Sequence, residues 1–209
     1  MKRKTIGWVL LGVLVLPPAY IALGHGYALV SPAVRRKGRI TRSIDNLRTL
    51  LLYDIGTGGR VEALEPRYGG KRWVLRLVAA GLVSNSDPKQ FEILFSPGDD
   101  ARSLAKAGGP AAYARIARET LDDPAFDPRA LTSYVGPRLD EYAPRPPNAA
   151  SPDGDPIVAD LSFPGGVILG FPGGKVRWVE AEELGLPPGE PIVVGDASPH
   201  EWLRRLSDR

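Results

Sequence analysis

The residues most suggestive of catalysis lie near the C-terminus, where His200 precedes Glu201 and follows Asp196 by four positions. A histidine held by a carboxylate can serve as a general base. The same stretch also fits a short terminal helix, because Ser198-Pro199 is a typical helix start with Glu201 three residues after the serine. We therefore interpret Ser198–Leu206 as a helix with a solvated His200, and we expect no catalytic residue.

Three short acidic runs could provide the oxygen ligands that Ca²⁺ prefers: Asp99-Asp100, Asp122-Asp123 and Asp153-Gly154-Asp155. None has the ligand spacing of a dedicated calcium loop, which favours solvated turns. The chain also has no cysteine, only two histidines, and no glycine-rich phosphate motif or GxSxG nucleophile motif. We expect no metal, no cofactor and no enzymatic activity.

The charge is divided unevenly along the chain. Residues 1–42 contain eight Lys and Arg side chains and no Asp or Glu, whereas the other 167 residues contain 19 basic and 24 acidic side chains. The basic character therefore belongs to the N-terminal segment, and no nucleic-acid partner is expected.

An uncharged stretch of 26 residues runs from Thr5 to Val30. About 20 residues of helix cross the hydrocarbon core of a bilayer, so the stretch predicts a membrane anchor over residues 1–34. The residues taken to mark the span are Ile6, Trp8, Leu11, Leu16, Tyr20 and Leu23. The alternative is a signal peptide cleaved after Gly24. Basic residues flank both ends, so charge alone leaves the orientation open.

Apolar spacing predicts helices in the remaining chain. Ile40, Ile44, Leu47 and Leu51 form one stripe of an amphipathic helix that should end near Asp54. Further short helices are predicted over 72–82, 110–121 and 180–184, and an exposed loop over 138–154.

Strands are predicted from shorter apolar runs. Phe91–Phe95 alternates in part like a strand, and three runs (156–163, 167–171 and 175–179) are separated by Gly165-Gly166 and Gly173-Gly174. Glycine pairs between such runs predict an antiparallel meander. We expect Val176 and Trp178 on opposite faces of its last strand.

Three sequence blocks resemble the type IV pilin and pseudopilin class, and most closely its bacterial branch with a C-terminal His-x9-Asp-Gly motif. The first block runs from the hydrophobic segment into Asp45-Asn46-Leu47-Arg48 and Leu51-Leu52-Tyr53-Asp54. The second runs from Trp73-Val74-Leu75 to Phe95-Ser96-Pro97-Gly98-Asp99-Asp100. The third runs from Asp160 to Val176.

The chain departs from that family pattern at its defining positions. Phe163 replaces the histidine, and Gly173-Gly174 stands where the family has Asp-Gly, although the spacing of ten positions is kept. Ser96 stands where cysteine is common. Near the N-terminus, Gly7-Trp8 imitates the prepilin cleavage site, but Gly12 stands where a glutamate belongs.

The resemblance implies an α+β, pilin-like fold in which an N-terminal helix packs on a small antiparallel sheet, with a soluble domain over residues 35–209. It implies a single-pass envelope protein whose C-terminal domain is periplasmic or extracellular. Its partners would be the lipid bilayer and other pilin-like subunits, in a structural role. The alternatives are a periplasmic binding domain released by signal peptidase and, third, an envelope hydrolase using His200 or the loop acids.

Overall fold

The computed structural model describes residues 31–56, 68–83, 87–139, 154–187 and 189–208. The chain divides into two compact units, residues 1–38 and 39–209. The predicted membrane span, from Ile6 to Leu23, and most of the loop predicted over 138–154 lie outside the described residues. In the described part of the chain, no helix combines the length and the apolar character needed to cross a membrane.

The amphipathic helix predicted from the Ile40–Leu51 stripe is present as α2, Pro32–Gly56. Proline is favoured in the first turn of a helix, because its missing N–H would have no intrahelical partner there. Leu47 and Leu51 are buried, and Ile40 and Ile44 pack half-buried against the same hydrophobic cluster. The stripe therefore faces the interior of the 39–209 unit, as the spacing predicts.

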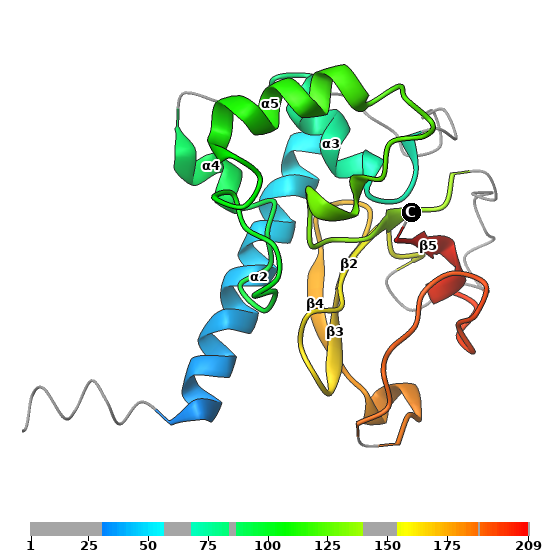
Figure 1. Cartoon of the computed structure of the whole chain (residues 1–209). Helices are drawn as coiled ribbons and strands as arrows, with labels where there is room; N and C mark the ends of the chain where they lie inside the picture. The colour runs from blue at the N-terminus through cyan, green and yellow to red at the C-terminus, as the bar shows by residue number, and fades with distance from the viewer. Residues whose placement is uncertain (1–30, 57–67, 84–86, 140–153, 188, 209) are drawn as a thin grey trace, which may run out of the picture. The chain divides into compact units, whose positions relative to one another are not determined.

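The predicted meander is confirmed as a three-stranded antiparallel sheet in the order β2 (Val158–Asp160), β3 (Gly166–Gly170) and β4 (Val176–Glu180). It lies beside α2 (Figure 1), and a Cβ atom on Gly170 would come within 2.9 Å of the Leu51 side chain. The absence of a side chain at Gly170 therefore lets the helix approach the sheet closely.

The expectation that Val176 and Trp178 lie on opposite faces of the last strand was wrong. Both side chains pack against the cluster that contains Leu47 and Leu51, because residues two apart along a strand point to the same face of the sheet. Gly173 and Gly174, in the turn before β4, have φ angles of 85° and 86°. Glycine adopts these positive values without steric cost, so the glycine pair forms the predicted turn.

Three helices lie together near the C-terminal end of α2 (Figure 1): α3 (Arg72–Ala79), α4 (Pro88–Glu92) and α5 (Gly109–Thr120). The helices α3 and α5 confirm the predictions over 72–82 and 110–121. The predicted strand Phe91–Phe95 was wrong, since Phe91 belongs to α4. Asp87 caps that helix by accepting a hydrogen bond from the Lys89 N–H at 3.0 Å, and Pro88 follows at its first position.

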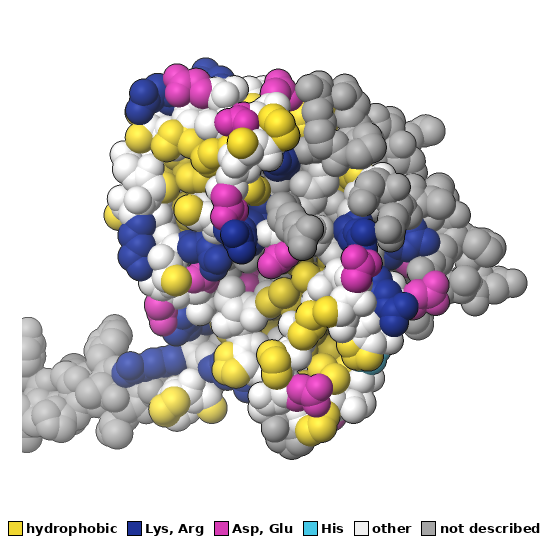
Figure 2. All heavy atoms as spheres, turned by 45° about the vertical axis from the view of Figure 1, so that its right-hand side comes forward, with side chains coloured by type: hydrophobic (Ala, Val, Ile, Leu, Met, Phe, Trp, Pro, Cys, Tyr) yellow, Lys and Arg dark blue, Asp and Glu magenta, His cyan; other side chains and the backbone are white. Residues whose placement is uncertain are grey.

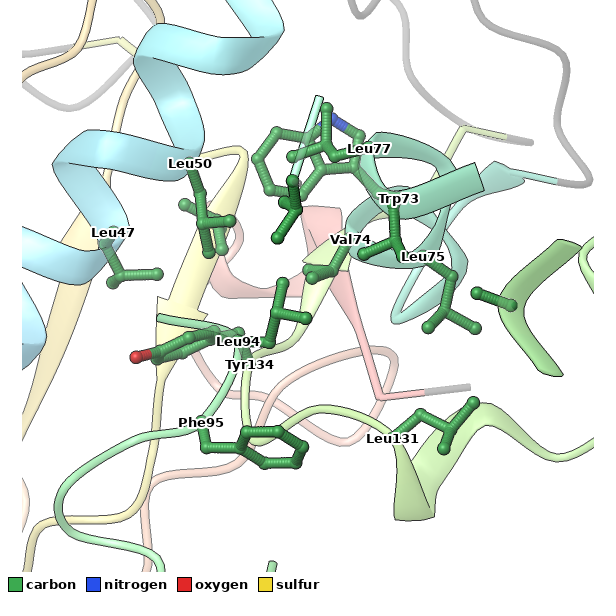
Figure 3. Close-up of a cluster of buried hydrophobic side chains, with 14 of the residues drawn as sticks. Leu47, Leu50, Trp73, Val74, Leu75, Leu77, Leu94, Phe95, Leu131 and Tyr134 are labelled. Atoms are coloured by element: carbon green, nitrogen blue, oxygen red, sulfur yellow. The ribbon is translucent and has the colours of Figure 1, made fainter. Parts of the chain in front are cut away.

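The main hydrophobic core joins these helices to α2 and to the sheet. Figure 3 shows Trp73, Val74 and Leu77 of α3 facing Leu47 and Leu50 of α2. Phe91 and Phe95 both meet the ring of Tyr113 edge-on, with centroid distances of 5.5 and 5.9 Å. These aromatic contacts explain why Phe91 is buried in the helical layer and not in the sheet.

The C-terminal helix predicted over Ser198–Leu206 was also wrong. A single 3-10 turn (Leu203–Arg205) leads into β5 (Leu206–Ser207), which pairs antiparallel with β1 (Gly136–Pro137). Leu206 is fully buried in a second hydrophobic cluster that contains Val167 and Phe171. Burial of Leu206 in an extended segment thus overrides the local helix signal. The predicted turn at 180–184 is confirmed by the 3-10 helix Glu182–Leu184.

Candidate functional site

Asp160, the last residue of β2, is fully buried and accepts hydrogen bonds on both carboxylate oxygens. The hydroxyls of Ser43 and Ser96 both donate to Oδ2, and the Ser162 N–H donates to Oδ1 at 2.9 Å. Ser43 comes from α2 and Ser96 from the loop after α4. A buried carboxylate with several donors is stabilised without solvent. The arrangement ties three segments together.

The three blocks of the family resemblance meet around this network. Asn46 of the first block donates from Nδ2 to the Phe95 carbonyl of the second block at 3.3 Å. Ser96 of the second block donates to Asp160 of the third. Both bonds join residues that are far apart in the sequence, so the blocks form one structural unit in the fold.

The altered motif positions are structural. Phe163 is buried, its ring meets Trp178 edge-on at a centroid distance of 6.3 Å, and it lies directly over Gly98. A Cβ atom on Gly98 would come within 2.9 Å of that ring. Phe163 therefore packs in the interior, and Gly173-Gly174 forms the turn before β4.

Lys71 lies immediately before α3 and is only 3% exposed. Its ammonium group donates to the main-chain carbonyls of Thr132 and Tyr134, at 3.2 and 3.3 Å. It also borders a cavity of about 400 Å³, whose lining includes Asp99, Arg102, Arg129, Ser133 and Asp208. On the face of the molecule in Figure 2, Lys and Arg side chains are interspersed with Asp and Glu side chains and form no broad basic patch.

Burial, together with the positive charge of Arg102, lowers the pKa of the Lys71 ammonium from 10.5 to about 8. Asp208, Asp99 and Asp160 act in the opposite direction. The lysine therefore carries a proton at neutral pH and loses it in mildly alkaline solution.

Two of the acids that line this cavity, Asp99 and Asp100, are paired with arginines. Burial acts to raise the pKa of Asp99, but its hydrogen bond with Arg102 (2.6 Å) and further donors outweigh burial and hold it below its ordinary value. Asp100 pairs with Arg39 at 3.1 Å. Asp127, just outside the cavity, pairs with Arg129 at 2.8 Å.

The candidate catalytic residues are not brought together. His200 is half-buried against the Trp202 ring, with a centroid distance of 5.7 Å, and Asp196 pairs with Arg138 instead. Asp153 of the third acidic run lies outside the described residues. Among the described residues, no group of three or more His, Cys, Asp or Glu side chains could hold a metal ion.

Sequence reasoning missed Lys71 and Asp160 as buried polar centres. Lys71 precedes the apolar run Trp73–Leu75, and Asp160 ends a short β-branched run, but neither position differs locally from a surface residue. The only sequence signal was that Ser96 and Asp160 belong to the resemblance blocks. Comparison of the chain with protein-family models, curated proteins and solved structures finds no match.

Proposed function

We propose that this protein is a membrane-anchored, pilin-like structural or interaction protein of the cell envelope, without catalysis of its own. In this proposal the N-terminal segment spans the membrane once, and the C-terminal domain is periplasmic or extracellular. Its partners are the lipid bilayer and other pilin-like subunits.

The packing of α2 on the meander carries this proposal. A long helix that follows an uncharged stretch of 26 residues and buries its apolar stripe against a small antiparallel sheet is the arrangement that the family resemblance implies. The meeting of all three resemblance blocks around Asp160 supports the same proposal, because the blocks are far apart in sequence.

The basic residues of α2 support a position close to a membrane surface. Arg35, Arg36, Lys37, Arg39 and Arg42 are all exposed and lie within about 10 Å of helix, at 1.5 Å per residue. The headgroup layer on each side of a bilayer is roughly 5–8 Å thick. Five cations just after the uncharged stretch therefore suit the polar layer at the end of a span.

Protease accessibility tests the proposal directly. The full chain carries a C-terminal tag and is expressed in a Gram-negative host, and spheroplasts are then treated with protease. We expect the tag to disappear from a full-length membrane species while a cytoplasmic marker survives. A protected tag in intact spheroplasts that is digested after lysis would place the domain in the cytoplasm and refute the proposal.

The alternative is a periplasmic binding or interaction domain released by signal peptidase. Intact mass separates the two functions, because cleavage after Gly24 removes 24 residues. The anchored protein keeps them and sediments with membranes. A shortened species in the periplasmic fraction would favour the released domain.

A further inference from the structure

Within the described part of the chain, the charge of Lys71 has no counterion within hydrogen-bond distance. Buried ammonium groups in proteins are normally paired with a carboxylate, because burying an isolated charge is costly. Across the residues that the structure describes, no carboxylate oxygen lies within 4.0 Å of the Lys71 ammonium, and its two acceptors are the neutral carbonyls of Thr132 and Tyr134. An ammonium group has three N–H donors, so one donor remains for another acceptor.

The three acids that line the cavity do not supply this acceptor. Asp99 accepts hydrogen bonds from the Arg102 guanidinium and from the main-chain N–H groups of Ala101 (2.9 Å) and Arg102 (3.2 Å). Asp100 pairs with Arg39. Asp208 acts on Lys71 only through its charge, from the cavity lining. Among the described residues, Lys71 therefore places a buried cation with an unused N–H donor beside the cavity.

We propose that this cavity binds a small oxyanion, a carboxylate or a phosphate, with one oxygen accepting the third N–H of Lys71. The volume of about 400 Å³ accommodates such a group together with water. Arg102 and Arg129 add positive potential on the cavity wall. This inference is independent of the membrane anchor, since every residue involved lies in the 39–209 unit.

Asp208 provides a second test, in which a substitution should strengthen anion binding. Its carboxylate lines the same cavity and opposes an anion through charge repulsion. Replacing Asp208 with asparagine removes that repulsion and leaves Lys71 in place. The proposal therefore requires two neighbouring substitutions to act in opposite directions, which a purely structural role for Lys71 does not explain.

The source of the oxyanion is either a free small anion or the C-terminal carboxylate of a peptide. Calorimetric titration of the full chain in non-ionic detergent at constant ionic strength would use acetate, inorganic phosphate and an acetylated tripeptide, with the matching tripeptide amide as a probe that lacks the carboxylate. Saturable binding of acetate or phosphate indicates a free anion. Binding of the tripeptide acid but not of its amide or of acetate indicates a peptide terminus.

We expect Lys71→Gln to weaken binding at least tenfold and Asp208→Asn to tighten it. Lys106→Gln is the matched control, because Lys106 also donates to two main-chain carbonyls, of Asp100 and Ala101 (2.8 and 2.9 Å), but is exposed. Affinity should also fall as the pH rises above about 8, where Lys71 loses its proton.

Absence of saturable binding for every probe would overturn the proposal, as would unchanged affinity in a folded Lys71→Gln variant. If Lys71→Gln does not fold, the Asp208→Asn variant decides, and unchanged or weaker binding by it refutes the site. Binding that is lost equally in Lys106→Gln would place the anion on the exposed loop and also refute it.

Discussion

Asp160 and Lys71 are two buried charged residues of the same unit, and they differ in how their hydrogen-bonding capacity is filled. Asp160 accepts from two hydroxyls and a main-chain N–H, and it lies between α2, the loop after α4 and the sheet. Lys71 donates to two neutral carbonyls beside a cavity of about 400 Å³.

This difference indicates a structural role for Asp160 and a candidate binding role for Lys71. The oxygens of Asp160 are used by donors that arrive from three segments, so the residue fixes their arrangement. Lys71 has a spare donor next to open space. Tyr134 connects the two regions, since its carbonyl accepts from Lys71 and its hydroxyl accepts from Asn46 at 3.2 Å.

Removal of the Asp160 carboxylate should have the largest effect on stability. Asp160→Ala removes the acceptor of two buried hydroxyls and of the half-buried Ser162 N–H, and we expect a loss of about 3–5 kcal/mol in the free energy of unfolding, measured by urea titration. Asp45→Ala is the control, because Asp45 is 62% exposed and its bond to Arg48 should contribute less than about 1 kcal/mol. Similar losses in the two variants would contradict the structural role.

Burial of Lys71 should make the free energy of unfolding depend on pH. Below pH 8, both the folded and the unfolded state hold the Lys71 proton, and burial of the charge opposes folding. Between about 8 and 10.5 the folded state loses the proton first, so the unfolded state binds more protons and the free energy of unfolding rises with pH. The full rise from this group is roughly 3 kcal/mol.

Lys71→Met should lack this rise, which urea titrations from pH 7 to 10 would measure. The buried phenols of Tyr113 and Tyr134 have pKa values raised by burial. Their contribution is present in both proteins and cancels in the difference. Parallel stability curves for the wild type and Lys71→Met would show that Lys71 is not a buried cation.

The two serines that donate to Asp160 should contribute unequally to the free energy of unfolding. Ser96 donates to Asp160 and also accepts from the main-chain Gly98 N–H at 3.0 Å. Ser43 donates to Asp160 and also interacts with the Tyr134 hydroxyl, which keeps its bond with Asn46 when the Ser43 hydroxyl is removed. We expect Ser96→Ala to cost about 2 kcal/mol and Ser43→Ala about 1 kcal/mol. Thermal and urea unfolding would rank them, and the reverse order would be inconsistent with the double role of Ser96.

Tyr134→Phe should have the smallest effect on stability. It also tests whether the region around Asp160 and the region around Lys71 act independently. The substitution removes a hydrogen-bond partner of Asn46 and of Ser43, which keep their bonds to the Phe95 carbonyl and to Asp160, so we expect a loss of about 1 kcal/mol in the free energy of unfolding. The main-chain carbonyl that accepts from Lys71 is retained. The stability rise between pH 8 and 10.5 should therefore remain, and its disappearance would show that the two regions are coupled.

Most secondary structure could be predicted wherever the local pattern agrees with the tertiary environment. The α2 stripe, α3, α5 and the meander depend on spacing and on glycine turns, which are local signals. Phe91 and Leu206 were placed in the wrong elements, because contacts with Tyr113 and the pairing of β5 with β1 are long-range. Val176 and Trp178 of β4 were assigned to opposite faces of the sheet, although side chains alternate along a strand and residues two apart share a face.

The sequence by itself determined the α+β class, the uncharged N-terminal stretch with its flanking basic residues, and the turns at Gly165 and Gly173-Gly174. These properties follow from composition and local geometry. Only the tertiary structure decided that Asp160 is saturated by donors and that Lys71 lies buried beside a cavity. The reason is physical: whether a charged group is solvated, paired or left with a spare donor depends on segments about 60 or more residues away, and no local spacing encodes those distances.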